Sequence, residues 1–83
     1  MVLFAKVKAG HDKNHIYMIK ESNEKQISLV NGTTKTMDHP KKKNLIHIQV
    51  IKKLPDSVQK ILEEHEEMIT DEVIAEALKE YNS

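Results

Sequence analysis

Apolar and polar residues alternate through the first 54 positions with the two-residue period of β-strands. Five segments are predicted to be strands: 2–7, 16–19, 26–30, 33–37 and 45–51. In the last segment, Ile46, Ile48 and Val50 fall on one face. Short strands with tight connections are typical of a small barrel, either closed or half-closed.

The connections between these strands carry their own signals. Gly10 lies in a polar stretch over residues 9–15 that is expected to form a loop. Asn31 and Gly32 both accept positive φ, which predicts a type I′ hairpin turn between segments 26–30 and 33–37. Residues 38–44 are predicted to form a basic loop.

Pro55 marks the change from strand to helical periodicity. Asp56 or Ser57 is expected to cap a helix that continues to about Glu67. Thr70, followed by two acidic residues, predicts a second helix that includes Tyr81. Both helices are amphipathic, so their apolar sides must pack on another surface, and the open end or outer face of the barrel is the most economical one. The expected organisation is a barrel over residues 1–54 and an acidic helical extension over 55–83, packed on or beside it.

Charge divides the chain at the same boundary. The net charge is zero, but residues 1–54 hold eleven lysines and four acidic residues, a net charge of +7. Residues 55–83 hold two lysines and nine acidic residues, a net charge of −7. Such asymmetry points to a polyanionic partner of the basic half. The chain has no arginine, so contacts would depend on point charges and backbone shape more than on bidentate reading of bases.

Three segments carry a resemblance to a known family: Val7 to Lys13, Leu29 to Gly32, and Pro40 to Gln49. They resemble the KOW motif and its surroundings in large-subunit ribosomal proteins of archaea and eukaryotes. The similarity is greater to the short bacterial KOW-domain RNA-binding proteins, whose tail the helix over 70–81 also resembles. In order and spacing the resemblance covers nearly the whole chain.

The resemblance implies a mainly β fold, an SH3-like five-stranded barrel followed by two short acidic helices. It also implies RNA contact through the KOW loop and neighbouring lysines. The predicted RNA-binding residues are Lys8, Gly10, His11, Lys13, Asn14, Lys41, Lys42, Lys43 and Asn44. The chain departs from the motif at Asn14, where KOW loops usually have a second glycine. Asparagine tolerates the left-handed conformation better than most residues, so the turn is expected to survive.

The plainer interpretations of these residues stay open. Gly10 has a structural role wherever φ is positive, whether or not the loop amides meet a phosphate. A lysine run such as 41–43 is often only a solvated surface, although here it lies in the half with the +7 charge. Among the aromatic residues only Tyr17 is considered as a stacking surface for bases, and packing within a strand is the stronger expectation for it.

Other kinds of site find no support in the sequence. There is no cysteine, and the five histidines lack the spacing of a metal site. The segment His65 to Ile69 begins like a zinc-protease motif but has isoleucine where the second histidine belongs. No catalytic motif, cofactor or metal is therefore predicted, and no membrane segment. We expect a cytoplasmic protein.

The predicted function is non-catalytic binding of structured RNA, ribosomal or ribosome-associated. The alternative is a protein-interaction module of the translation or transcription machinery. In that case the helices would dock a protein partner, with Val73, Ile74 and Leu78 as anchors. The acidic helices would otherwise solubilise the protein or compete with RNA for the basic half.

Overall fold

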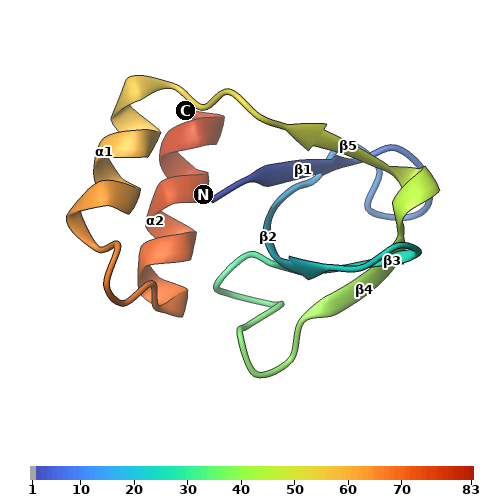
Figure 1. Ribbon diagram of the computed structural model, residues 1–83. Coiled ribbons are helices and arrows are strands. Elements are labelled where there is room, and N and C mark those ends of the chain that lie inside the picture. Colours follow the sequence, from blue (N-terminus) through green and yellow to red (C-terminus); the bar gives the residue numbers. More distant parts are fainter. Residues whose placement is uncertain (1) are drawn as a thin grey trace.

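In the computed structural model, which describes residues 2–83, an antiparallel sheet of five strands precedes two helices (Figure 1). The strands are β1 (Phe4–Val7), β2 (Ile16–Ser22), β3 (Gln26–Val30), β4 (Lys41–Asn44) and β5 (Ile48–Ile51). They lie in the order β4-β3-β2-β1-β5. A 3₁₀ turn, η1 (Leu45–His47), joins the two edge strands. The helices are α1 (Asp56–Glu64) and α2 (Asp71–Asn82). The expected mainly β fold with C-terminal helices is confirmed.

Both faces of the sheet bury apolar side chains. On the face toward the helices, Phe4, Met18 and Val30 form one row across β1, β2 and β3, because the strand register pairs Phe4 with Met18 and Met18 with Val30. The opposite face has a separate cluster made by alternate residues of the same strands. Its buried members are Ala5, Val7, Tyr17, Ile27, Leu29 and Ile48.

The helices complete the first of these two cores. Their apolar sides are buried against the sheet and against each other, and both helices lie together beyond one side of the sheet in Figure 1. Buried helical residues are Val58, Leu62, Val73, Ile74, Ala77 and Leu78. Tyr81 at the end of α2 meets Phe4 edge to face, with ring centroids 5.5 Å apart. The sheet and helices therefore share one hydrophobic core.

The helix boundaries follow their capping residues. Thr70 caps α2 as predicted, since its hydroxyl oxygen accepts a hydrogen bond from the Val73 amide. The predicted first helix is three residues too long, because α1 ends at Glu64 and residues 65–67 form a turn. Its N-cap is Pro55, and neither Asp56 nor Ser57 provides a side-chain cap.

The predicted hairpin at Asn31 and Gly32 is wrong. Only Gly32 has positive φ, at 79°, whereas a type I′ turn needs it at both positions. The Asn31 side chain instead accepts hydrogen bonds from the amides of Thr33 (3.0 Å) and Lys35 (2.8 Å), which folds the chain into a turn there. Residues 33–37 are therefore not a strand, despite their β-branched side chains.

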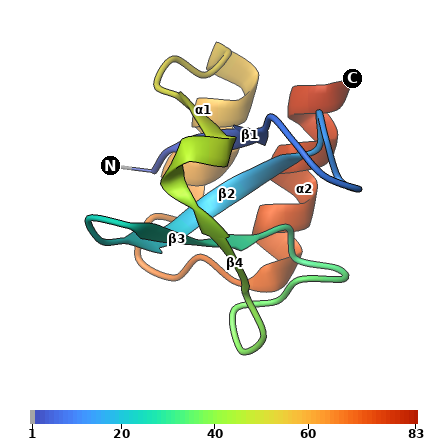
Figure 2. The same cartoon turned by 90° about the vertical axis from the view of Figure 1, so that its right-hand side faces the viewer.

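The partner of β3 is instead the lysine run, which was predicted to be a loop. Figure 2 shows the connection over residues 31–40, drawn in green, extending away from the sheet before β4 returns beside β3. The predicted last strand also starts too early, because residues 45–47 form η1 and the Asn44 side chain accepts a hydrogen bond from the Ile46 amide at 3.0 Å. Ile46 is consequently 72% exposed, while Ile48 is buried.

Gly32 is a point of close contact between the connection and α2. A Cβ atom at Gly32 would overlap the carbonyl oxygen of Asp71 and lie 2.8 Å from the amide nitrogen of Ala75. Beside it, the Asp71 carboxylate accepts a hydrogen bond from the Met37 amide at 2.9 Å. Residues 31–40 are thus fastened to the first turn of the second helix.

We expect Gly32→Ala to destabilise the protein by about 3 kcal/mol or more, because it combines left-handed strain with overlap of helix backbone. Gly10→Ala is the matched control: φ is also positive there (97°), but the nearest atom to a new Cβ is the flexible end of Lys43 at 3.2 Å. That variant should lose only about 1 kcal/mol. Urea unfolding measures both, and equal losses would contradict the proposed contact between Gly32 and α2.

Candidate nucleic-acid interface

The loop over residues 8–15 joins β1 to β2 and is held by backbone hydrogen bonds at its base. The Asn14 amide donates to the Val7 carbonyl (2.7 Å), and the Lys8 amide donates to the His47 carbonyl (2.8 Å). Gly10 and Asn14 adopt positive φ, at 97° and 73°. Asn14 is the only non-glycine residue of 2–83 to do so, which confirms that asparagine accepts the left-handed turn.

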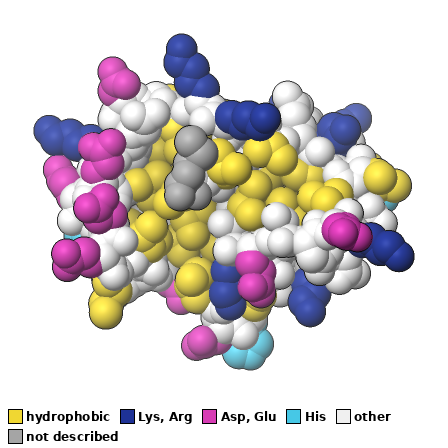
Figure 3. Space-filling model, in the orientation of Figure 1, with side chains coloured by type: hydrophobic (Ala, Val, Ile, Leu, Met, Phe, Trp, Pro, Cys, Tyr) yellow, Lys and Arg dark blue, Asp and Glu magenta, His cyan; other side chains and the backbone are white. Residues whose placement is uncertain are grey.

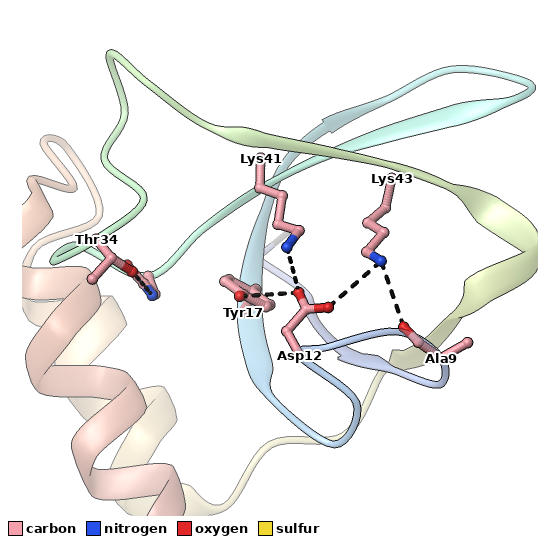
Figure 4. A network of polar contacts seen from close by, with 7 residues as sticks. Ala9, Asp12, Tyr17, Thr34, Lys41 and Lys43 are labelled. Carbon is pink, nitrogen blue, oxygen red and sulfur yellow. Dashed lines mark hydrogen bonds and ion pairs between the residues drawn. The ribbon is translucent and has the colours of Figure 1, made fainter.

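Asp12 points inward from this loop and gathers three donors around its carboxylate (Figure 4). Lys41 Nζ lies 2.8 Å from Oδ2, and Lys43 Nζ lies 3.5 Å from Oδ1. The Tyr17 hydroxyl donates to Oδ2 at 3.2 Å. Lys43 also reaches the Ala9 carbonyl at 3.5 Å. Asp12 is only 7% exposed, so this is a buried and multiply paired carboxylate.

The strand geometry of β4 explains why two lysines of the run reach Asp12. Successive side chains of a strand point to opposite faces, so Lys41 and Lys43 share one face and Lys42 and Asn44 share the other. The inner pair lies opposite Leu29 and Ile27 of β3, over the second core. The Lys41 and Lys43 side chains are 28% and 20% exposed. The run is therefore not a uniformly solvated patch.

These contacts shift the pKa values of the network. Burial alone would raise the pKa of Asp12, but hydrogen bonding and the charges of Lys41 and Lys43 outweigh it and lower the pKa from 3.8 to about 2. The hydrogen bond to Asp12 raises the pKa of Lys41. Burial, followed by the Asp12 charge, raises the pKa of Tyr17. At neutral pH the network consists of one carboxylate, two ammonium groups and a neutral phenol.

The remaining predicted residues are exposed but form two groups. On the loop, the exposed residues are Lys8, Gly10, His11, Lys13 and Asn14. Lys42 and Asn44 are exposed on the other face of β4. There, Lys42 lines the same polar depression as Glu21, which places a carboxylate near it. The structure thus divides the predicted site into three parts. These are the exposed residues of loop 8–15, the two lysines that pair with Asp12, and the outer face of β4 with Lys42 and Asn44.

Sequence reasoning missed Asp12, whereas the stronger expectation for Tyr17, packing within a strand, is confirmed. Tyr17 is 5% exposed and packs in the second core, so it offers no stacking surface for bases. The signal that could have indicated Asp12 was a lone acidic residue in a basic loop. The two lysines that pair with Asp12 lie about thirty residues away in the sequence, and they could be assigned only once β4 was recognised as a strand.

Acidic and basic side chains are segregated in space as well as in sequence. Figure 3 shows acidic side chains gathered over the helices and lysines mostly over the strands. Glu63, Glu64, Glu66 and Glu67 are all exposed at the end of α1 and in the turn after it. In Figure 1 the helices and loop 8–15 occupy opposite ends of the molecule. The surface formed by these four glutamates therefore lies away from loop 8–15.

The described residues offer neither a metal cluster nor a membrane-spanning helix. Within residues 2–83, no cluster of three or more His, Cys, Asp or Glu side chains is placed to hold a metal ion. No helix in that range is long and apolar enough to cross a membrane.

Comparisons with known proteins do not decide the family. No protein-family model matches the chain, and no curated protein is significantly similar to it.

The depressed pKa of Asp12 predicts an acid-sensitive contribution to stability. Because the folded pKa (about 2) lies below the unfolded value near 3.8, the contribution is complete above pH 4 and disappears as the pH falls toward 2. It should be about 2 kcal/mol, from the size of the shift. Urea unfolding of the wild type and Asp12→Asn between pH 2 and 7 measures it. The stability difference between them should shrink with acidification; a constant difference would contradict the assignment.

Proposed function

We propose that the protein binds structured RNA without catalysing a reaction, through the phosphates that meet loop 8–15. The observation that carries this proposal is that the charged side chains of the loop differ in where they point: the acidic one points inward and the basic ones point to solvent. The loop's only acidic residue, Asp12, is turned inward and paired, while Lys8 and Lys13 are exposed. The outer surface of the loop therefore offers cations, histidines and backbone groups to a polyanion, with no exposed carboxylate from the loop itself.

The residue types favour recognition of phosphates and shape over reading of bases. Lysine offers a mobile point charge, and the chain has no arginine to form bidentate contacts. Phe4 and Tyr17 are buried, and Tyr81 is half-buried and packs against Phe4, so no aromatic ring is fully exposed for stacking on bases. A folded RNA with a defined phosphate backbone suits this surface better than a single strand does.

The chain path supports an SH3-like barrel as the scaffold of this loop. β1 lies between β2 and β5, and η1 separates β4 from β5. The η1 segment is tied to residues that flank β3 and β1: the Leu45 amide donates to the Lys25 carbonyl (3.0 Å), just before β3, and the His47 carbonyl accepts from the Lys8 amide, just after β1. Together with the resemblance to KOW-domain proteins, this arrangement makes ribosomal or ribosome-associated RNA the proposed partner.

The competing proposal, protein binding through the helices, loses the anchors suggested for it. Val73 and Leu78 are each 6% exposed and Ile74 is fully buried, because all three pack in the core shared with the sheet. These side chains cannot reach a partner while the protein is folded. A protein contact would need other residues.

A salt titration with large-subunit ribosomal RNA tests the RNA proposal. We expect the logarithm of the binding constant to fall linearly with the logarithm of salt concentration, with a slope of about −0.9 for each phosphate neutralised in a duplex. Lys13→Gln should weaken binding and reduce the magnitude of this slope by about 1, since it removes one such contact.

Lys79→Gln is the matched control, because it removes the same charge from an exposed position on α2. It should change affinity and slope far less than Lys13→Gln does. Equal effects of the two variants would show that net charge, and not the loop, governs binding. Absence of any salt-dependent binding by the wild type would contradict the proposed function itself.

A further inference from the structure

We propose that Asp12 is a positioning residue that strengthens phosphate binding by loop 8–15, although its own charge repels phosphate. This inference rests on the proposed function and adds to it. It assigns Lys41 and Lys43 the task of holding the loop through Asp12, instead of binding phosphate directly.

The first argument is where the contacts of Asp12 come from. Its carboxylate receives Lys41 and Lys43 from the edge strand β4 and the Tyr17 hydroxyl from β2. No side chain other than Asp12 links the middle of the loop to both strands among the hydrogen bonds and ion pairs of residues 2–83. One buried residue thus fixes the loop both to the strand that follows it, β2, and to β4, which is about thirty residues away.

The second argument is the position of Asp12 between the two left-handed residues. Gly10 and Asn14 both adopt positive φ, and each flanks Asp12 at a distance of two residues. The backbone turns around Asp12 as well: the Lys13 amide donates to the Gly10 carbonyl at 3.2 Å, and the His15 amide donates to the Asp12 carbonyl at 3.0 Å. Fixing the Asp12 side chain therefore constrains the part of the loop that directs Lys13 and His11 outward.

The third argument is the balance of charge and order. One carboxylate faces two ammonium groups, so the network keeps a net positive charge beneath the loop. Since a flexible loop must lose conformational freedom when it binds, a loop already held in place loses less on binding and binds more tightly. Long-range repulsion from a carboxylate paired with two lysines is largely cancelled at the loop surface.

Simple electrostatics and positioning predict opposite results for Asp12→Asn. Removal of an anion from a basic surface should tighten RNA binding. Loss of a positioning residue should weaken it, by roughly five- to tenfold at constant salt. We expect the weaker binding. Asp38→Asn, at an exposed acid of the 31–40 connection, removes the same charge outside the network and should bind RNA as tightly as the wild type or slightly more tightly.

The salt dependence separates a positioning role from direct contact. Asp12→Asn should lower affinity for ribosomal RNA with an unchanged slope against salt, because no phosphate contact is removed. Lys41→Met combined with Asp12→Asn should cost little more than Asp12→Asn alone, since Lys41 holds the loop through its ion pair with Asp12 at 2.8 Å. A loss equal to the sum of the two single variants, with a reduced slope, would show that Lys41 binds phosphate itself, and would overturn the inference.

Amide hydrogen exchange of the free protein gives a readout that needs no RNA. In Asp12→Asn, exchange at Asn14 and His15 should accelerate, while the buried amides of β2 and β3 keep their protection. Tighter RNA binding by Asp12→Asn, or unchanged exchange in the loop, would refute the positioning role. If the wild type binds no RNA, the proposed function itself is refuted. If the wild type binds RNA and Asp12→Asn binds it more tightly, only the positioning role of Asp12 is refuted.

Tyr17→Phe provides a milder test in case Asp12→Asn does not fold. It removes only the hydroxyl that donates to Asp12 Oδ2 and leaves the ring in the core. We expect a smaller loss of affinity, about twofold, again with an unchanged salt slope. Wild-type affinity together with wild-type loop exchange in this variant would count against the network as a positioning device.

Discussion

Ion pairs of Asp12 with Lys41 and Lys43 hold loop 8–15 against the edge strand β4. A carboxylate that is 7% exposed is tolerated because two ammonium groups and a hydroxyl surround it. Removing both lysines would leave a buried charge without an ion pair, so the loop and β4 are mutually dependent. The contact joins residues about thirty positions apart in the sequence.

The two halves of the chain share a core but differ in the charge they expose. Phe4, Met18 and Val30 of the sheet pack directly on α1 and α2, so the helices provide apolar cover for one side of the strands. Their outward faces carry the glutamates. Together these features place the negative charge at the end of the molecule away from loop 8–15, where it interferes least with a polyanion approaching the loop.

Much of the fold followed from local patterns. The strands near 4–7, 16–19 and 26–30, the Thr70 cap and the left-handed Asn14 were all predicted, because each depends on periodicity or on one residue's own conformational preference. The errors share a cause. Residues 33–37 have strand propensity, but hydrogen bonds to the Asn31 side chain compete with pairing, and three consecutive lysines gave no local sign of strand β4.

The division of charge, the absence of arginine and the glycine-centred basic loop are properties of the sequence, and they suffice to suggest a polyanion as partner. The use of the lysine run depends on contacts between distant segments. The pairing of β4 with β3 turns Lys41 and Lys43 toward Asp12 and leaves Lys42 on the other face. Alternation along a strand assigns side chains to faces, but which face meets a buried carboxylate depends on packing between distant segments.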